Sequence, residues 1–566
     1  EPYAIAITNA TQPGQSRVIE KGTKNEFYTV NLFSDYSRQL GDHYFKVMGG
    51  FNAEHQNVRT LSTQRDGIIV PDLPTIDTST EQDVAGGGYN HWATAGFFGR
   101  LNYNYKEKYL LEVNGRYDGT SRFMKDQRWN FFPSFSLGWN VARENFWKPL
   151  ESVVNQFKLR GSWGELGNQN TSNLYPFYEI LPVKSNSGNW LVNGGKTNTA
   201  DIPSLVSTLL TWERVRSFNV GFDFGAFSNR LTGSFDYFVR KAVDMVGPAP
   251  QLPLVLGIAP AIVNNADMKS YGFEIELSWR DRIGEVDYGV KFNLADAQQK
   301  VVKYPNTTNA FSDWYAGKMS GEIWGYTSLG IAKTDEEMKE HLASLPNGGQ
   351  NQLGNKWGAG DIMYADINGD GKIDGGKGTL ADPGDQRIIG NSTPRYNFGL
   401  VLDASYKGFD VSIFFQGVGK RDYAPIVGTN GAVFWGAVNN IWQSMAMEEH
   451  FDYFRPEGHP MGANLNGYYP RPDFTSNKNH QVQTRYLQDA SYIRLKNLQI
   501  GYTLPKQWIN KLHINRCRVY VSGDNLWTGT SLASMFDPET LAAGDWGSGK
   551  TYPLSKVISF GLNVNF

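Results

Sequence analysis

Apolar and polar residues alternate one by one along many segments of this chain. The alternation is clearest at 395–406 and 409–416, where an apolar residue follows nearly every polar one. It recurs near 101–105, 111–117, 135–141, 218–224, 231–239, 271–280 and 558–566. Because the side chains of a β-strand point alternately to opposite faces, each segment is predicted to be a strand with one apolar and one polar face. The chain is therefore predicted to be all-β.

The connections between these segments alternate between short and long. Short connections are predicted near 39–42, 107–108, 225–230, 281–285 and 407–408, and moderate ones at 143–153 and 505–513. Long connections are predicted at 55–92, 119–130, 166–212, 243–269, 298–394, 419–489 and 525–554. Outer-membrane barrels have tight turns on one side and long loops outside the cell, whereas a soluble sandwich has no reason to keep this parity. The pattern predicts a transmembrane antiparallel β-barrel with long extracellular loops, to which this chain supplies about fifteen strands.

Composition and charge narrow the class of protein further. Aromatic residues make up 14 % of the chain, and a barrel can carry them on its lipid face. No apolar run approaches the roughly 18 residues that a membrane helix needs. The net charge of −2 gives no excess of basic residues for nucleic acid. Cys517 is the only cysteine, so the chain has no internal disulfide and no cysteine-based zinc site.

The order of short and long connections also predicts the direction of the strands. The last strand, 554–566, follows a long loop and is expected to run inward, which places the C-terminus in the periplasm. The first clear strand, 27–38, is also expected to run inward, so residues 1–25 are predicted to belong to an extracellular loop. A bacterial single-chain barrel needs an even number of strands. We therefore expect residues 1–566 to be the C-terminal part of a larger outer-membrane barrel.

The chain ends in an alternating apolar row with a terminal aromatic residue. The apolar members of this row are Phe560, Leu562, Val564 and Phe566. The row is similar to the C-terminal signal by which the barrel-assembly machinery recognises its clients. An ordinary final strand is the alternative interpretation.

One segment of the longest connection, 298–394, is similar to the first part of a calcium-binding loop. Oxygen-bearing residues recur at every second position, and Gly371 stands where such loops turn sharply. The predicted ligands are Asp366, Asn368, Asp370, Lys372 through its carbonyl, and Asp374. Calcium would have a structural role here, and no organic cofactor is expected. A metal-free turn rich in Asn, Asp and Gly is the alternative.

The last ligand of such a loop is displaced in this sequence. Lys377 stands where an acidic residue is expected. Asp385, which follows an apparent insertion at 375–384, is the predicted replacement. Asp382 is a second candidate, and Asp361 lies close by in the sequence.

Aromatic residues in the predicted outer loops are candidates for contact with sugar rings, whose C–H faces stack on aromatic side chains. The main candidates are Trp190, Trp314, Tyr315 and Trp435, with Trp324 and Trp442 as further ones. Packing within the loops is the alternative for each of them. Trp139, Trp163 and Trp279 lie on predicted strands and are expected in the aromatic rows at the membrane interfaces.

The sequence gives little support for catalysis. It has 8 His residues but no HExxH motif, no Gly-x-Ser-x-Gly elbow and no phosphate-binding loop. Glu274 and Glu276 share a strand face, where a polar barrel wall explains them better than a catalytic pair. Residues 334–345 are expected to form a loop helix. The chain is therefore predicted not to be an enzyme.

Several motifs in order along the chain resemble the SusC/RagA family of TonB-dependent outer-membrane transporters. They are GRLNYNY at 99–105, YLLEVNGRYDGTSR at 109–122, FPSFSLGW at 132–139, LRGSWG at 159–164, GNQ at 167–169, GDIMYADINGDGKID at 360–374, RIIGN at 387–391 with Pro394, and YIRLKN at 492–497. The resemblance implies a barrel of about 22 strands with a plugged lumen. It also implies that the plug and the segment that contacts TonB belong to an N-terminal part absent from this chain.

The same resemblance implies active import of a nutrient across the bacterial outer membrane. A SusD-like surface lipoprotein would act as a lid, and two transporter–lipoprotein pairs could form a dimer. The family imports oligosaccharides or peptides, and the aromatic loop residues favour oligosaccharides. The alternatives are a soluble extracellular glycan-binding or glycan-degrading β-protein, and a passive porin.

Overall fold

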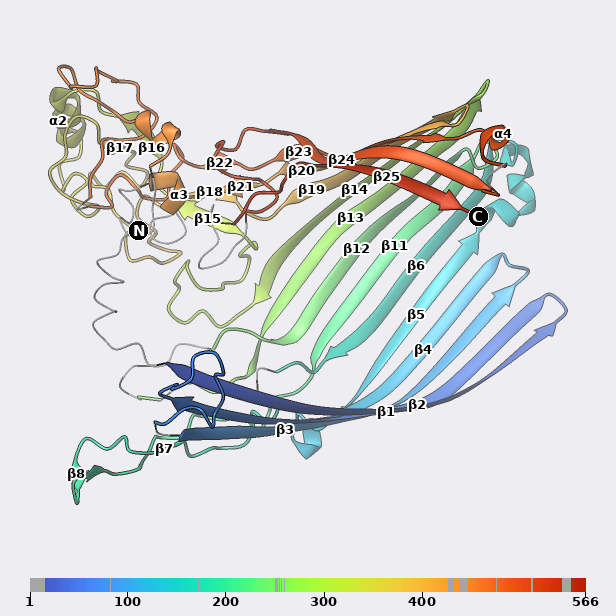
Figure 1. Ribbon diagram of the computed structural model, residues 1–566, viewed down its shortest axis with the longest axis horizontal. Coiled ribbons are helices and arrows are strands. Elements are labelled where there is room, and N and C mark those ends of the chain that lie inside the picture. The colour runs from blue at the N-terminus through green and yellow to red at the C-terminus, as the bar shows by residue number, and fades with distance from the viewer. Residues whose placement is uncertain are drawn as a thin grey trace. The chain divides into compact units, whose positions relative to one another are not determined.

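Fifteen strands of the chain form one sheet in the computed structural model (Figure 1). The structure describes residues 16–566 except 82, 172, 250–252, 254, 256, 259, 426–431, 437–445, 475, 511–512 and 542–550. In sheet order the strands are β1 (Arg17–Leu40), β2 (His43–Asp66), β3 (Asp83–Tyr105), β4 (Tyr109–Thr120), β5 (Trp129–Asn140), β6 (Val154–Asn168), β11 (Glu213–Ala226), β12 (Leu231–Val246), β13 (Asn264–Ile283), β14 (Val286–Lys303), β19 (Arg395–Tyr406), β20 (Phe409–Lys420), β23 (Tyr492–Thr503), β24 (Arg516–Thr530) and β25 (Val557–Asn565). The prediction of about fifteen strands is confirmed.

The remaining elements are short and lie in the connections. The small strand pairs are β7 (Val183–Lys184) with β10 (Thr199–Ala200), β8 (Leu191–Val192) with β9 (Gly195–Lys196), β15 (Glu322–Gly325) with β18 (Arg387–Asn391), β16 (Ser328–Ile331) with β17 (Ile362–Tyr364), and β21 (Asp422–Tyr423) with β22 (Gln488–Asp489). The helices are α2 (Asp335–Ala343), α3 (Ala432–Trp435), α4 (Lys506–Ile509), η1 (Lys125–Gln127), η2 (Val141–Arg143), η3 (Asn145–Leu150) and η7 (Glu448–Phe451). Within the described part of the chain, none of these helices has the length and apolar character that a membrane-crossing helix requires.

The predicted alternation of short and long connections is present except between β4 and β6, where the connection 121–128, predicted to be long, is shorter than the connection 141–153. Tight turns at 41–42, 106–108, 227–230, 284–285 and 407–408 join successive strands of the sheet. The turn between β19 and β20 consists of Lys407 and Gly408, with φ of 46° and 90°. Because positive φ values at both positions match the twist of the flanking strands, this pair closes the hairpin with the register that the alternation requires.

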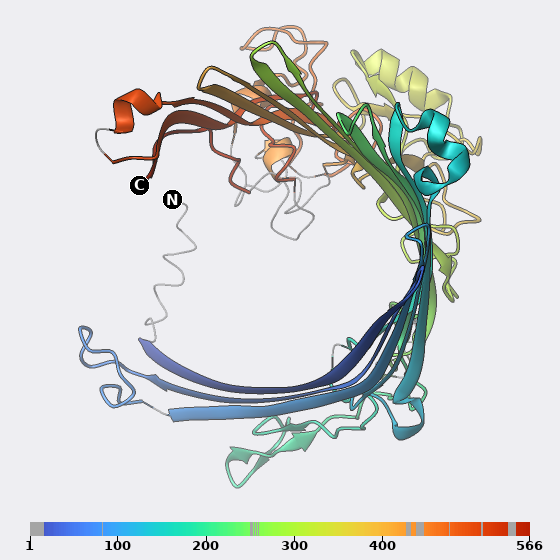
Figure 2. The same cartoon turned by 90° about the vertical axis from the view of Figure 1, so that its right-hand side faces the viewer.

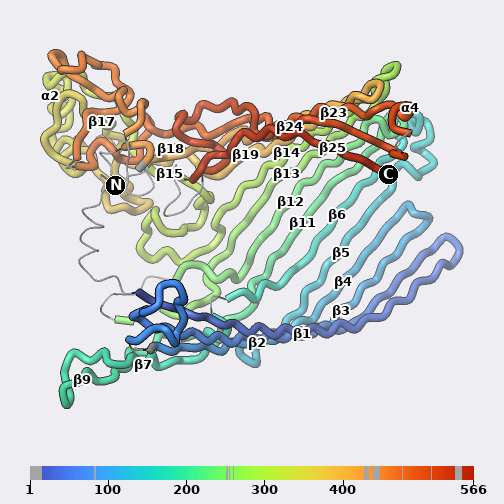
Figure 3. Tube along the Cα trace, in the orientation of Figure 1, coloured from blue at the N-terminus to red at the C-terminus, as the bar shows by residue number. Residues whose placement is uncertain are grey.

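The chain divides into two compact units. The first contains β1–β4 with most of β5 and parts of β6 and β11–β13, and in it β1, β2 and β3 lie side by side (Figure 2). The second contains the rest of these strands, the later strands and the longest connections, and in it β13, β14 and β19 lie side by side (Figure 3). A small core of Phe123, Phe132, Leu210 and Trp212 packs beside the strands of the first unit.

The register of β1–β5 in the first unit places apolar residues on one face of the sheet and polar residues on the other. One row across β1–β5 consists of residues directly opposite one another, namely Tyr36, Val47, Leu101, Val113 and Phe135. The adjacent row consists of Asp35, Met48, Arg100, Asn114 and Ser134. Since neighbouring rows point to opposite faces, the apolar side chains form one wall and the polar ones the other. Exposed apolar residues in such a wall fit a lipid-facing surface.

Aromatic residues gather in the row at the turn end of β1–β5. This row contains Leu40, His43, Tyr105, Tyr109 and Trp139. The Tyr105 and Tyr109 rings lie 6.3 Å apart between centroids, and the Tyr109 and Trp139 rings 6.5 Å. Trp163 stacks on Phe135 at 6.1 Å. Trp139 therefore lies where the sequence predicts an interfacial aromatic row.

The prediction that residues 1–25 belong to a loop is wrong for residues 17–25. They form the first part of β1, in register with 58–66 of β2. The flanking loop is also shorter than predicted, because strands β2 and β3 extend to Asp66 and from Asp83. Hydrophobic alternation is weak here, since both faces of these extensions carry polar residues. Main-chain pairing holds them, together with an ion pair between Arg17 and Asp66. Residues 1–15 lie outside the described residues.

Candidate functional site

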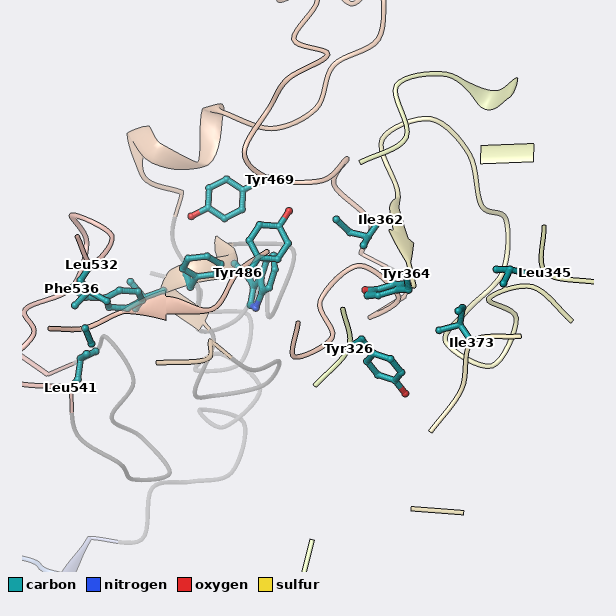
Figure 4. Close-up of a cluster of buried hydrophobic side chains, with 14 residues drawn as sticks. Tyr326, Leu345, Ile362, Tyr364, Ile373, Tyr469, Tyr486, Leu532, Phe536 and Leu541 are labelled. Atoms are coloured by element: carbon teal, nitrogen blue, oxygen red, sulfur yellow. The ribbon is translucent and has the colours of Figure 1, made fainter. Parts of the chain in front are cut away.

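Three long connections pack around one hydrophobic core, and we call their described residues within 304–394, 421–491 and 531–541 the loop body. The core residues come from all three connections, and Figure 4 labels ten of them. Tyr364, Tyr486 and Phe434 are essentially fully buried. Tyr364 donates a hydrogen bond of 2.6 Å from its hydroxyl to the carbonyl of Lys478 in the next connection. The connections thus form a folded body with its own core.

A buried carboxylate ties the first two connections together. Asp361 is fully buried and accepts hydrogen bonds from both Nε and Nη2 of Arg471, at 2.8 and 2.6 Å. Lys478 Nζ and Asn479 Nδ2 each donate to it at 2.9 Å, and the Gly358 amide donates at 2.9 Å. Because every oxygen is paired with a charged or polar donor, the buried charge is compensated. Asp361 is thus a structural centre of the loop body.

The predicted calcium turn is ordered by its own hydrogen bonds. The Asp366 carboxylate accepts from the amides of Gly369 and Gly371 at 2.7 and 2.8 Å. The Asn368 side-chain oxygen accepts from the Asp370 amide at 3.0 Å. Gly371 has a φ of 79°, a conformation in which other residues are strained. The tight turn expected from the sequence is therefore present.

A lysine ammonium lies among the carboxylates of this turn. Lys372 Nζ is 2.5 Å from Asp374 Oδ2 and 3.8 Å from Asp370 Oδ2. Its hydrogen bond holds the pKa of Asp374 below the usual range. The oxygens of the turn thus already attract one cation, which is the property that a calcium site needs.

Asp385 joins the two ends of the turn instead of facing these oxygens. Its carboxylate accepts from the amides of Ile367 at 2.8 Å and Asp374 at 2.9 Å, and its own amide donates to the Asp374 carbonyl at 2.9 Å. Burial raises the pKa of this carboxyl. The main-chain carbonyl of Asp382 accepts hydrogen bonds from the amides of Lys377 and Thr379. Asp385 therefore stabilises the turn by joining its two ends.

The fit to calcium is partial. Within the described ranges, no three His, Cys, Asp or Glu side chains are gathered closely enough to hold a metal ion. Asp366, Asn368, Asp370 and Asp374 lie in one turn, and the Lys372 ammonium contacts Asp370 and Asp374 of this set. Asp385 is turned away toward main-chain amides. Calcium at this turn stays a prediction, with Asp385 outside the set that faces the cation.

The aromatic residues proposed for sugar contact have different surroundings. Trp190 is largely exposed, whereas Trp435 is almost completely buried in the core of the loop body. Tyr315 donates to Glu322 at 2.6 Å, and Trp314 packs edge-on against Tyr304 at 5.9 Å. Trp324 stacks on Phe311, and Trp442 lies outside the described residues. Of the four main candidates, Trp190 alone offers most of its ring to solvent.

An apolar pocket of about 330 Å³ opens in the loop body, and we call it the aromatic pocket. Its walls include Trp435, Met447, Phe451, Tyr469, Phe474 and His480. The ring of His480 lies 4.5 Å from that of Trp435. Of these wall residues, only Trp435 was predicted from the sequence to contact a ligand, although the aromatic and proline-rich segment 468–474 was a further local signal. The walls of the pocket come from residues scattered over 435–480, which no sequence periodicity connects.

A second hollow, of about 520 Å³, lies on the sheet of the second unit. Asp223, Glu276, Lys291 and Asn293 contribute polar groups to its walls. Glycines keep the hollow open, since a Cβ at Gly399 would lie 2.6 Å from the Asn293 side chain. Glu274 and Glu276, which were predicted to belong to a polar wall, thus line concave parts of this sheet.

The final strand presents its apolar row as predicted. Val521 pairs with Phe560 and Val519 with Leu562 across β24 and β25. Phe560 and Phe566 are among the most exposed aromatic residues of the chain. Recognition of this row by the assembly machinery stays a prediction.

Comparison with known proteins identifies the family. Residues 4–526 match the family model described as TonB dependent receptor-like, beta-barrel. The chain belongs to this family of outer-membrane β-barrels. The recognition of a TonB-dependent barrel from the sequence motifs is thereby confirmed.

Individual relatives agree with this assignment. The chain is 28 % identical to TonB-dependent receptor P3 of Formosa agariphila, over 95 % of this chain and 52 % of the relative. It is 24 % identical to TonB-dependent receptor SusC of Bacteroides thetaiotaomicron, over 95 % of this chain and 50 % of the relative. The chain thus spans about half the length of these curated relatives.

A solved structure shares the fold. The RagAB peptide transporter superposes with a TM-score of 0.76 at 20 % identity, over 97 % of this chain and 56 % of that chain. This likeness supports the barrel architecture that the strand pattern predicts.

Proposed function

We propose that this chain forms wall and outer loops of an active importer of short peptides across the bacterial outer membrane. Import would draw energy through TonB, which would act on the part of the protein that this chain does not contain. A SusD-like surface lipoprotein would cover the loops. The observation that carries the choice of peptide is the aromatic pocket, whose walls offer apolar surface and few free hydrogen-bonding groups.

Exposed apolar side chains on the loop body support the lipoprotein lid. Leu329, Met461 and Phe474 each expose more than half of their surface. Contiguous exposed apolar groups are typical of a surface that another protein covers, and in this proposal these residues belong to such a surface. A dimer of transporter–lipoprotein pairs is compatible with this arrangement.

Oligosaccharide import is the second candidate. Trp190 favours it, because a broadly exposed indole ring can stack on a sugar ring. The other three predicted sugar contacts are engaged in packing or hydrogen bonds within the loops.

The proposal is tested on the complex purified from detergent-solubilised outer membranes. Intact-mass measurement should find a surface lipoprotein, and the remainder of a larger receptor, together with this chain. Radiolabelled peptide mixtures should bind to that complex more tightly than oligosaccharide mixtures of equal mass. A protein that is monodisperse without detergent and binds neither class would contradict the proposal.

We also propose that the turn 366–374 binds a structural calcium ion weakly. The lysine ammonium among its carboxylates supports this, since those oxygens already attract positive charge. The ion would hold the loop in shape and would take no part in chemistry.

A further inference from the structure

Three wall residues of the aromatic pocket, Arg471, His450 and Tyr453, have their polar groups engaged inside the loop body. Arg471 Nε and Nη2 both donate to Asp361. His450 Nδ1 accepts from the Met447 amide at 2.9 Å, and its Nε2 lies 3.0 Å from the Val433 carbonyl. The Tyr453 hydroxyl donates to the sulfur of Met461 at 3.8 Å. A ligand in this pocket would therefore meet mainly carbon surface.

The least exposed residue of the wall, His480, is also uncharged at neutral pH. His480 is 2 % exposed, and its Nδ1 has no hydrogen-bond partner. Burial lowers the pKa of this imidazole to about 4, so the ring is uncharged at neutral pH. Its contact with Trp435 thus adds a flat, uncharged surface to the pocket.

Acidic residues stand next to the wall residues along the chain. Glu448 and Glu449 lie in η7, between Met447 and His450, and both are exposed. Asp473 lies between two further wall residues, Pro472 and Phe474. The cations nearby are Arg471, which is paired with Asp361, and Arg455, whose guanidinium donates to the carbonyls of Phe451 and Gly462. Lys478 Nζ also lies 3.9 Å from Asp473 Oδ2. The surroundings of the pocket are therefore negative in balance.

We propose that the aromatic pocket binds one apolar side chain, preferably aromatic, of a peptide that carries Lys or Arg beside that side chain. This inference rests on the proposed import of peptides and names the class of peptide. The apolar wall takes up the ring, and the neighbouring carboxylates attract the flanking cations. The volume of about 330 Å³ lies at the small end of ligand pockets, as suits a single side chain.

A saccharide fits this pocket poorly for a physical reason. Each buried hydroxyl needs a hydrogen-bond partner, and an unpaired one costs free energy. Arg471 and His450 are committed to partners in the protein, while Pro470 and Pro472 have no amide hydrogen to donate. The pocket therefore discriminates against hydroxyl-rich ligands.

Binding of defined peptides to the purified receptor tests the proposal. The probe is the blocked pentapeptide Gly-Lys-Phe-Lys-Gly, measured by calorimetry beside versions with Ala for Phe and with Glu for both Lys. Phe451→Ala and Phe474→Ala should each weaken binding of the Phe peptide by about tenfold, since each removes much of the contact area of one ring. Both side chains are exposed, so folding should survive their removal. Leu329→Ala, an exposed apolar residue of the loop body outside the pocket, is the matched control and should leave binding unchanged.

A separate variant tests the proposed attraction between the acidic residues beside the pocket and the lysines of the peptide. Glu448→Gln should weaken binding of the Lys-containing peptide by about threefold. It should also reduce the salt dependence of that binding, because dissolved salt screens the attraction between an exposed carboxylate and the peptide. Glu457→Gln, another exposed carboxylate of the same connection, is the control and should have no effect.

The possible results distinguish a failure of the pocket assignment from a failure of the proposed transport function. Equal binding of the Phe and Ala peptides, or wild-type binding by both Phe→Ala variants, would overturn the pocket assignment while leaving TonB-dependent peptide uptake intact. Pocket-dependent binding without any uptake by cells would support the pocket and contradict the importer. If neutral oligosaccharides compete with the peptide for the wild-type receptor but not for Phe474→Ala, the pocket binds saccharides, and its proposed specificity for peptides is overturned.

Discussion

Arg471 donates two hydrogen bonds to the carboxylate of Asp361, from Nε at 2.8 Å and from Nη2 at 2.6 Å. The two residues belong to different connections, so their pairing holds one loop against another. Lys478 shares the same carboxylate and is 1 % exposed. The shape of the loop body, and of the pocket in it, depends on this buried charge.

Asp361→Asn should destabilise the loop body without unfolding the sheet. The change leaves Lys478 and Arg471 without their compensating charge, and breaking a buried pair costs about 3–5 kcal/mol. Tryptophan fluorescence during urea unfolding, with limited proteolysis of residues 304–491, measures the loss. Glu340→Gln, an exposed acidic residue on α2, is the control. Equal proteolysis of both variants would contradict the structural role of Asp361.

The loop body should lose stability as the pH falls from about 6.5 to about 4. Burial lowers the pKa of His480 to about 4 in the folded state, so the unfolded chain binds the proton first. The contribution is therefore complete above pH 6.5 and is lost as the pH falls through this window, by up to about 3 kcal/mol. The free energy of unfolding of the loop body, measured at several pH values, shows this slope.

His480→Phe isolates the histidine from other titrating groups. The variant keeps an aromatic ring against Trp435 and removes a nitrogen without a partner, so its stability at neutral pH should be close to wild type. Its slope between pH 4 and 6.5 should be smaller than that of the wild type. An unchanged slope would show that another group causes the pH dependence.

Phe135→Arg and Ser136→Arg, adjacent on β5, should differ strongly. Phe135 lies in the apolar row with Val113, and Ser136 pairs with Glu112 on the other face. An arginine on the lipid face costs about 2–4 kcal/mol near the bilayer midplane, whereas one on the polar face meets a carboxylate. Heat-modified mobility on gels and unfolding from lipid vesicles compare the two. Equal tolerance would contradict the assignment of the faces.

Lys372→Gln should raise the calcium affinity of the turn by about fivefold, because it removes a competing positive charge close to Asp374. The wild-type dissociation constant should lie at about 10⁻⁴–10⁻³ M, as in extracellular modules. Calorimetry of the detergent-purified receptor with calcium chloride measures both. Asp366→Asn should abolish binding, and calcium-independent behaviour of all three proteins would show a metal-free turn.

Local patterns were sufficient to predict the sheet. Alternation identifies strands such as β19 and β20 because each side chain must suit either of two faces. Thr334 caps α2 by accepting the Glu337 amide at 3.1 Å, and the predicted helix at 334–345 agrees with α2 over Asp335–Ala343. These features depend on neighbours close in sequence.

The loop body depends on contacts between residues far apart in sequence. Trp435 was predicted as a contact for a sugar ring, with packing as the alternative, and the structure buries it against Tyr469 and Tyr486. Asp385 has the residue type of a metal ligand, yet main-chain amides occupy its carboxylate. Residue type and spacing do not distinguish these uses, because both depend on which segments meet in the folded chain.

The central claim is energy-dependent import through this barrel, and uptake by cells tests it most directly. Radiolabelled Gly-Lys-Phe-Lys-Gly is given to cells that express the full receptor, with and without functional TonB. Accumulation of the peptide should be lost without TonB and reduced in Phe474→Ala cells, while Leu329→Ala cells should behave as wild type. Equal accumulation with and without TonB would contradict energy-dependent import.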